Sequence, residues 1–198
     1  RAKILCRKRH TTSTQISHPK KGQLMNSVEQ MHLNGNTVME LVQFKPPYTV
    51  GASFKDEACF IHVLKGNVGF MFNNTQYQMQ SNDSIMMYNK QFVDLYFTQS
   101  NTTCKVLIIH FCNDVLHYIF NKSLPPIFNR RASNKSGVDL LNKNELVSMY
   151  VHNLLYFFEN EQQTNSNIIA LKMKEVLLVI SQLETLNTSL KTSKHENV

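Results

Sequence analysis

The sequence predicts an α+β domain in which a small β-barrel or sandwich comes first and two longer helices follow. Three observations lead to this fold class. Short apolar segments separated by turn residues fill the first part of the chain, two stretches with helical spacing follow them, and 42% of the 198 residues are hydrophobic. Such a length and composition are enough for one globular domain with its own core. A barrel encloses a volume that a ligand can occupy.

The stretch from Glu57 to Tyr88 predicts hairpins and is the most informative part of the sequence. Its apolar-rich segments are 58–64, 67–72 and 84–88. Gly66 can adopt positive φ in a tight turn, and the Asn, Asp and Ser residues after the other segments can hydrogen-bond the local backbone. The other predicted strands are 38–44, 92–98 and 103–111. The last of these is apolar enough to be a central strand that is buried on both faces.

Helices are predicted in the second part of the chain. Asn113 and Asp114 can cap a short helix from 114 to 120, and residues 129–143 are predicted to form a loop. Residues 144–158 place their apolar side chains on one broad face at helical spacing. A second long helix is predicted from about 166 to 184, with Thr164 or Ser166 as its cap. We expect the polar tail, residues 186–198, to contain no further element.

The apolar residues of the last helix divide into two groups. The larger group is Ile169, Met173, Val176, Leu177, Ile180 and Leu183. The smaller stripe is Ile168, Leu171, Leu178 and Val179. Leu171 and Leu178 are seven residues apart, which is typical of a coiled-coil seam. The predicted homodimer interface is Ile168, Leu171, Glu175 and Leu178. The alternative, that both groups are intramolecular core, fits the spacing equally well.

The net charge of +7 does not predict a nucleic-acid-binding domain. Of the 21 basic residues, seven lie within residues 1–21, which contain no acidic residue. The remaining 14 basic residues are balanced by the 14 acidic residues of the chain. We therefore expect residues 1–23 to be a basic, disordered arm and the body of the domain to be neutral.

The composition predicts a cytoplasmic protein without a membrane partner. No apolar stretch approaches the roughly 20 residues that span a bilayer, and no signal peptide follows the basic start. The cysteines lack the spacing of a metal or redox motif; they are Cys6, Cys59, Cys104 and Cys112. We expect them to be reduced and structural.

The histidines of the strands do not have the pattern of a metal-dependent enzyme. Such a barrel site needs two or three His and a carboxylate that converge. His62 and His110 lie in separate strands, and neither Glu40 nor Asp94 has a histidine beside it in the sequence. We expect both histidines to be hydrogen-bonded core residues, and we expect no metal, no cofactor and no catalysis. The common catalytic and nucleotide-binding motifs are also absent from the sequence.

The predicted strands indicate which residues could line a ligand cavity in the barrel. Alternation along 58–64 places Phe60, His62 and Leu64 on one face and Cys59, Ile61 and Val63 on the other, and leaves open which face points inward. A few polar groups in an apolar cavity are typical of a ligand pocket. The predicted ligand-binding residues are Phe60, His62, Tyr88, Tyr96 and His110. A barrel filled by its own side chains is the alternative.

Several segments resemble the amino-terminal regulatory domain of AraC-family transcription regulators. In order they are EACFIHVLKGNVGFMF, SNDSIMMY, VLIIHF leading into NDVLHYIF, LLYFFEN and ALKMKEVLLVI. The resemblance extends over roughly residues 38–184. It implies a cupin-like double-stranded β-helix followed by helices, a small effector or a regulatory protein as partner, and dimerisation through the helices. It also implies control of a carboxy-terminal DNA-binding module with two helix-turn-helix motifs.

The expected layout is a cupin-like barrel over 24–128, the loop at 129–143 and a helical dimerisation region over 144–185. The printed sequence ends at Val198, before the position at which the resemblance places the DNA-binding module. DNA binding is therefore expected of a parent protein and not of these residues. The expected function is that of a non-enzymatic effector-sensing and dimerisation domain. The alternatives are a stand-alone cupin metalloenzyme and a purely structural dimerisation module with a filled barrel.

Overall fold

The computed structural model describes residues 25–45, 48–54, 57–72, 75–87, 91–97, 103–121, 138–141, 143–160 and 164–195. The strands are β1 (Met25–Leu33), β2 (Asn36–Phe44), β3 (Tyr48–Phe54), β4 (Glu57–Lys65), β5 (Asn67–Phe72), β6 (Thr75–Gln80), β7 (Ser84–Met87), β8 (Gln91–Phe97), β9 (Cys104–Cys112) and β10 (Val138–Leu141). The helices are α1 (Asn113–Ile119), α3 (Glu145–Glu159) and α4 (Ser166–His195). Within this part of the chain no helix is both long enough and apolar enough to cross a membrane.

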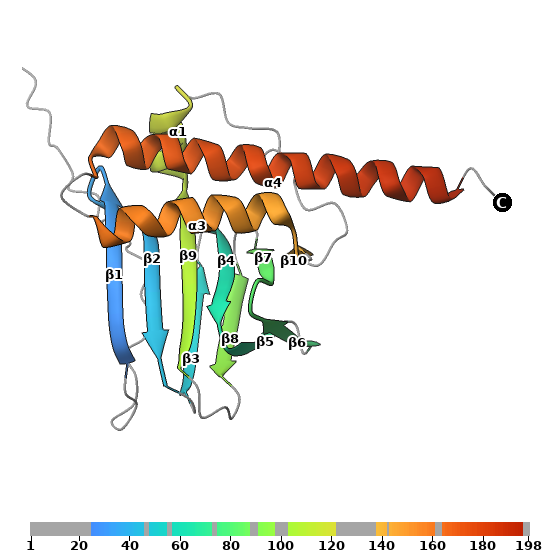
Figure 1. Cartoon of the computed structure of the whole chain (residues 1–198), viewed down its shortest axis with the longest axis horizontal. Coiled ribbons are helices and arrows are strands. Elements are labelled where there is room, and N and C mark those ends of the chain that lie inside the picture. The colour runs from blue at the N-terminus through green and yellow to red at the C-terminus, as the bar shows by residue number, and fades with distance from the viewer. Residues whose placement is uncertain are drawn as a thin grey trace, which may run out of the picture.

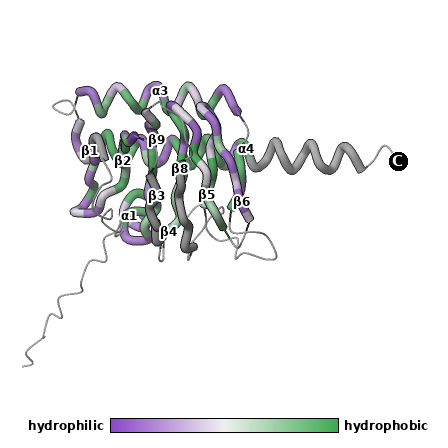
Figure 2. The backbone as a smooth tube through the Cα atoms, turned by 90° about the horizontal axis from the view of Figure 1, so that it is seen from below, coloured by the Kyte–Doolittle hydropathy of each residue, from purple (hydrophilic) through white to green (hydrophobic). Residues whose placement is uncertain are grey.

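The strands form two antiparallel sheets, and the long helices cover the larger one (Figure 1). The six-stranded sheet has the order β1-β2-β9-β4-β7-β10, and the four-stranded sheet has the order β3-β8-β5-β6. Seen from below, α3 runs along one side of the strands and alternates between hydrophilic and hydrophobic residues (Figure 2). The fold is thus a cupin-like barrel of two sheets followed by helices, which confirms the predicted fold class.

Two hydrophobic clusters lie on opposite faces of the six-stranded sheet. One joins the outer face to the helices and includes Phe60, Leu107 and Met173. The other lies between the two sheets and includes Ile61 and Ile108. Side chains alternate along each strand, so neighbouring residues of β4 belong to different clusters. The face that carries Phe60 and His62 therefore points towards the helices and away from the inside of the barrel.

Most predicted strands are confirmed, with ends shifted by one or two residues. Strand β9 lies inside the six-stranded sheet between β2 and β4, and is nearly all buried, as predicted. Gly66 adopts a φ of +87° in the turn between β4 and β5. A Cβ atom there would lie 2.5 Å from Cys104 Sγ, so this turn needs glycine for its conformation and for space.

Besides β10, three strands were not assigned from the sequence, namely β1, β3 and β6. The turn between β1 and β2 is an Asn34-Gly35 pair with φ values of 52° and 76°, which is a strong hairpin signal that the prediction missed. Strand β6 has mainly polar residues, and Tyr77 stacks on Phe70 of β5 with 4.6 Å between the ring centroids. Exposure of one face keeps such an edge strand polar.

The predictions for residues 129–143 and for the tail need correction. Residues 138–141 form β10, which pairs antiparallel with β7. Four residues are too few to show a period in the sequence, and tertiary pairing decides the structure of this strand. The tail prediction was wrong because α4 continues to His195. No glycine or proline follows Leu186 to end the helix. The predicted basic arm lies outside the described residues.

The predicted helices are confirmed, but two of their caps are not. Helix α1 begins after Cys112 without a side-chain cap. Helix α4 is capped by Asn165, whose Oδ1 accepts hydrogen bonds from the backbone N–H groups of Asn167 and Ile168, so neither Thr164 nor Ser166 is the cap. Helix α3 is capped by Asn144, whose Oδ1 accepts from the N–H of Leu146 at 2.9 Å.

Candidate functional site

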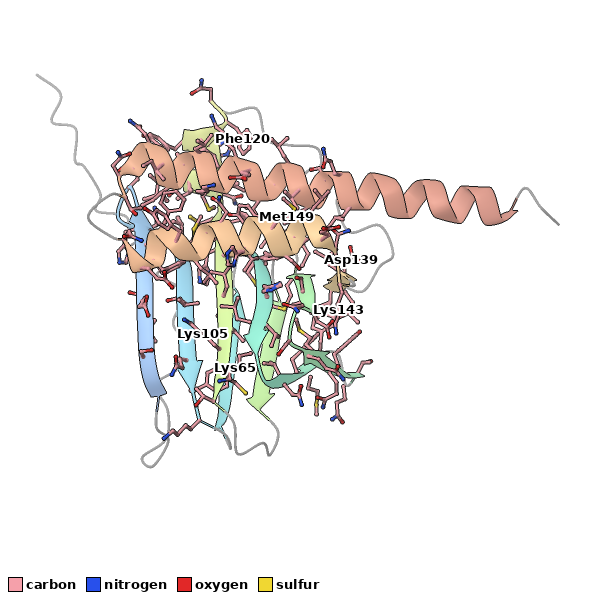
Figure 3. All side chains as sticks on the ribbon, viewed as in Figure 1. Lys65, Lys105, Phe120, Asp139, Lys143 and Met149 are labelled. Carbon is pink, nitrogen blue, oxygen red and sulfur yellow. The ribbon has the colours of Figure 1, made fainter. Side chains whose placement is uncertain are left out.

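A groove of about 390 Å³ lies between β4 and α3, on the outer side of the six-stranded sheet. Strand β4 contributes His62 and Leu64, and the turn before β7 contributes Asn82. Helix α3 contributes Ser148, Met149, Val151, His152 and Leu155. Met149, labelled on α3 in Figure 3, is 64% exposed. The groove therefore has an apolar body, a few polar groups and an opening to solvent.

Backbone hydrogen bonds hold the turn at one side of the groove. The N–H of Asn82 donates to the carbonyl of Val63 at 2.7 Å, and the N–H of Val63 donates to the carbonyl of Asp83 at 3.0 Å. The carboxylate of Asp83 accepts from the N–H of Gln80 at 2.7 Å. Asn82 has a φ of 71°, a conformation that asparagine tolerates better than most residues. The groove is therefore partly preformed by the backbone.

His62 is the buried polar residue of the groove, with 1% of its surface exposed. Its Nδ1 lies 2.7 Å from Ser84 Oγ on the neighbouring strand β7, and its ring stacks near Phe60. Burial lowers the pKa of His62 from the ordinary 6.5 to about 4, and the negative charge of Asp83 offsets only part of this shift. The imidazole is therefore neutral at neutral pH, as expected of a hydrogen-bonded core histidine.

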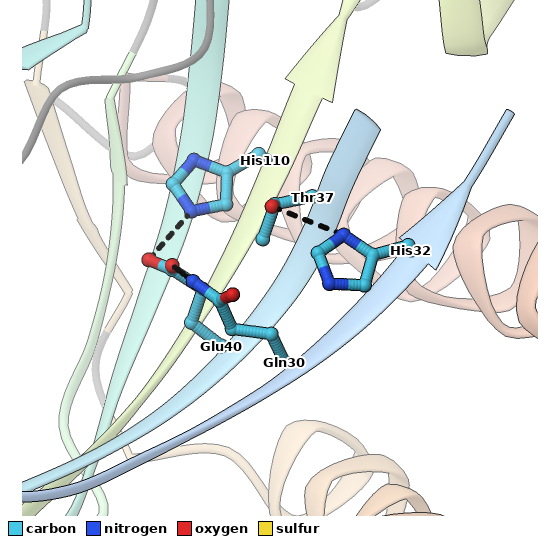
Figure 4. A network of polar contacts seen from close by, with 5 residues as sticks. All are labelled: Gln30, His32, Thr37, Glu40 and His110. Carbon is cyan, nitrogen blue, oxygen red and sulfur yellow. Dashed lines mark hydrogen bonds and ion pairs between the residues drawn. The ribbon is translucent and has the colours of Figure 1, made fainter. Parts of the chain in front are cut away.

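A second polar cluster lies on the opposite face of the same sheet (Figure 4). His110 Nε2 lies 3.1 Å from Glu40 Oε2, and Gln30 Nε2 donates to Glu40 Oε1 at 2.6 Å. In the strand pairing Glu40 is opposite Ile108 and His110 is opposite Cys59, and both of these neighbours belong to the cluster between the sheets. The pair therefore lies inside the barrel.

The balance of forces on Glu40 keeps it ionised. Burial raises the pKa of its carboxyl, but the hydrogen bond and charge of His110, the hydrogen bond of Gln30 and the charge of His32 together hold that pKa below the ordinary 4.5. The sequence expectation that Glu40 has no histidine beside it does not hold in three dimensions. Among the described residues no group of three or more His, Cys, Asp or Glu side chains could hold a metal ion.

The five predicted ligand-binding residues do not share one cavity. Phe60 and His62 face the helices, and only His62 lines the groove. His110 faces the space between the sheets, so the sheet itself separates it from His62. Tyr96 lies in β8 opposite Thr49, and Tyr88 is outside the described residues. The groove residues on α3 were missed because the sequence does not show where this helix crosses the sheet.

The predicted division of α4 into two faces is present in the structure. All members of the larger group are buried: Ile169, Met173, Val176, Leu177, Ile180 and Leu183. Leu171 and Leu178 are 61% and 67% exposed, which rules out intramolecular core for these two leucines. Ile168 and Glu175 are half-buried, and Glu175 Oε2 lies 2.7 Å from Lys172 Nζ. The structure therefore leaves the two leucines uncovered, whereas Val179 of the same stripe is half-buried and packs against the core cluster.

A cupin-like barrel followed by helices is the arrangement that the resemblance to AraC-type regulatory domains implies. A family model described as the ExsA N-terminal regulatory domain matches residues 58–191. The match covers more than half of the chain, so the chain belongs to this family and is a regulatory domain of an AraC-like transcription regulator. No curated protein sequence matches the chain.

Several solved structures are similar to parts of the chain. ToxT from Vibrio cholerae O395, bound to (E)-4-(8-methylnaphthalen-1-yl)but-3-enoic acid, is 13% identical with a TM-score of 0.49, over 74% of this chain and 56% of that one. The Cnp3 cupin domain of Schizosaccharomyces pombe is 8% identical with a TM-score of 0.40, over 46% and 63%. The polyketide cyclase RemF of Streptomyces resistomycificus is 16% identical with a TM-score of 0.34, over 38% and 54%. The chain thus spans less than two thirds of each of these proteins, and the family assignment does not depend on them.

Proposed function

We propose that the chain is the effector-sensing and dimerisation domain of a cytoplasmic AraC-like regulator and that it acts without catalysis. It controls a DNA-binding module that belongs to the longer parent protein. A small molecule or a regulatory protein is its effector, and it has no membrane partner. The observation that carries the proposal is the pair of exposed leucines on α4, Leu171 and Leu178, in a chain of this regulatory family.

Leu171 and Leu178 leave a large apolar area of α4 in contact with water. Burying a leucine side chain stabilises an assembly by about 1.5–3 kcal/mol. In a dimer with two-fold symmetry, the copy of each leucine in both protomers would be buried. Helix α3 also exposes Leu146 and Tyr156, which extend the apolar area beyond the short seam of α4. A homodimer through the helix layer accounts for all of these exposed side chains.

The proposed mechanism is a shift between conformations. An effector that binds one arrangement of barrel and helices better than another changes the populations of the two arrangements. The helix layer then presents a different geometry to the attached DNA-binding module. The effector needs no chemistry at its site, which fits a domain without a catalytic motif.

Replacing both leucines by aspartate, Leu171→Asp with Leu178→Asp, is expected to convert a dimer into a monomer. The seam would then place carboxylates where apolar side chains meet, and desolvating such charges without partners is costly. Light scattering after size-exclusion chromatography at matched concentrations measures the mass. Met71→Asp is the control, because Met71 is 45% exposed on β5, away from the helices. A monomeric wild type, or a double variant of unchanged mass, would contradict the proposed dimer.

Metal analysis separates this proposal from a stand-alone cupin metalloenzyme. Glu40 and His110 are in contact inside the barrel and are the residues that would supply ligands. A transition-metal site in a protein ordinarily takes three or more protein ligands. We therefore expect purified protein to contain no stoichiometric iron, manganese or zinc. Stoichiometric metal that is lost in Glu40→Gln would favour the enzyme instead.

A further inference from the structure

We propose that the effector site is the groove between β4 and α3, and that its ligand is an uncharged, mostly apolar small molecule with one hydroxyl group. This inference rests on the proposed sensing function and names the site and the ligand class. It places the ligand outside the barrel, between the sheet and the helix layer. The space between the sheets is instead packed by a hydrophobic cluster, as far as the described residues define it.

The size and lining of the groove determine the size and the apolar character of the ligand. A volume of about 390 Å³ is at the small end of the range of roughly 300–1,000 Å³ that ligand pockets occupy. Leu64, Met149, Val151 and Leu155 provide an apolar lining from both walls. An aromatic ring or a short alkyl chain matches this lining.

The charge of the lining excludes a strongly ionised ligand. Among the described residues that line the groove there is no Lys, Arg, Asp or Glu. Lys65 and Lys105 lie on the same side of the sheet (Figure 3), but they do not line the groove. An ionised group that enters the groove loses water and contacts no oppositely charged Lys, Arg, Asp or Glu side chain of the described lining, which is costly. A neutral ligand avoids this cost.

The hydrogen-bonding capacity of His62 determines which polar group the ligand carries. Its Nδ1 is bound to Ser84 Oγ, and the structure records no partner for Nε2 among the described residues, although the ring lines the groove. A polar atom that lines an apolar groove can fix the orientation of a ligand by a hydrogen bond. If Ser84 donates to Nδ1, then Nε2 carries the proton and needs an acceptor; in the other tautomer Nε2 needs a donor. A hydroxyl group serves as either, whereas an ether or a hydrocarbon does not.

The groove is connected to the helix layer through both of its walls. On one side, α3 contacts α4 through the hydroxyl of Tyr150, which donates to the carbonyl of Lys172 at 3.0 Å, and through Lys172 Nζ, which donates to Asn153 Oδ1 at 2.7 Å. On the other side, Ser84 pairs with Leu141 of β10, the strand that precedes α3. A ligand between these walls therefore favours one position of α3.

The test uses three probes of similar size on the full 198-residue chain. They are para-propylphenol, propylbenzene, which lacks the hydroxyl, and para-propylbenzoate, which is charged at pH 7. Binding is followed by NMR shifts of the methionine methyl groups and the histidine rings. The variants are Met149→Trp, which narrows the groove from its exposed rim, and His62→Phe, which keeps a ring but removes Nε2. Met71→Trp is the matched control for the added indole.

We expect para-propylphenol to saturate with a dissociation constant of about 1 mM or below and to shift Met149 and His62. Propylbenzene and para-propylbenzoate should bind at least about tenfold more weakly, as the loss of one buried hydrogen bond or the desolvation of a charge predicts. Met149→Trp should weaken the phenol about tenfold, and Met71→Trp should not. His62→Phe should remove the preference for the phenol over propylbenzene.

Equal binding of the three probes, no shift at the groove residues, or equal affinity of Met149→Trp and wild type would overturn the groove assignment. The Met149→Trp arm keeps the test valid if His62→Phe does not fold. The dimer mass is measured on the same samples. A normal dimer without phenol binding rejects the groove alone, whereas loss of the dimer itself rejects the proposed function.

Discussion

Replacing Phe60 by alanine is expected to lower the free energy of unfolding by about 3–5 kcal/mol. Phe60 is fully buried where the outer face of the six-stranded sheet meets the helices, in the cluster that also contains Leu107 and Met173. The cavity left by the ring cannot close without moving a helix that is held by many other contacts. Chemical denaturation monitored by circular dichroism measures the change.

The control for this substitution is Met71→Ala, on the exposed side of β5. Substitutions at exposed positions usually change stability by no more than about 0.5 kcal/mol. If Phe60→Ala costs less than about 1.5 kcal/mol, the helices do not pack on this face as the structure shows, because a large buried aromatic side chain rarely costs so little.

The second large effect is a loss of stability on acidification between pH 6.5 and pH 4, of about 3 kcal/mol from His62 alone. The pKa of His62 is about 4 in the folded chain and near 6.5 in the unfolded chain. Between these values the unfolded chain binds a proton that the folded chain does not. Unfolding is therefore increasingly favoured as the pH falls, until the folded chain is protonated as well.

Glu40 adds a separate loss at lower pH. Its folded pKa is held below 4.5, so its contribution to stability is present above 4.5 and is lost as the pH falls through the folded value. His62→Gln should flatten the upper part of the profile, and Glu40→Gln should flatten the lower part. Denaturation midpoints at a series of pH values measure both. A His62 ring that titrates near pH 6.5 by NMR would contradict the upper assignment.

Periodicity was sufficient to predict the elements whose two faces differ. In α4, the spacing separated Met173 and Ile180, which are buried, from Leu171 and Leu178, which are exposed. The helix needs only one apolar face to pack on the core. A second apolar stripe therefore stands out in the sequence, because packing on the core does not require it. Strands bounded by turn residues, such as β5 after Gly66, were also predicted correctly, because the signal lies in neighbouring residues of the sequence.

The faces of β4 could not be told apart in this way. The six-stranded sheet is covered on one side by helices and on the other by the second sheet, so both faces of β4 are apolar. Alternation then separates Phe60 from Ile61 without showing which residue lies inside the barrel. The choice depends on how the chain after β9 returns over the sheet.

The Glu40–His110 contact could not be predicted for another reason. The two residues are 70 positions apart in the sequence, and their contact follows from the pairing of β2 with β9. Strand order is a property of the whole topology and leaves little trace in any single segment. The groove has the same origin, since β4 and α3 are far apart in the sequence and are brought together only by the fold as a whole.

Helix α4 has one further consequence, which comes from its length. The helix runs across the sheet and continues past its edge (Figure 1). Leu183 is the last buried residue among its described side chains, and the helix ends at His195. At 1.5 Å per residue the part beyond this residue is about 18 Å long, so a tilt of about 10° at the sheet moves its end by about 3 Å. The helix is thus a lever arm whose pivot is the core, and it amplifies a small rotation at the sheet into a displacement at its far end.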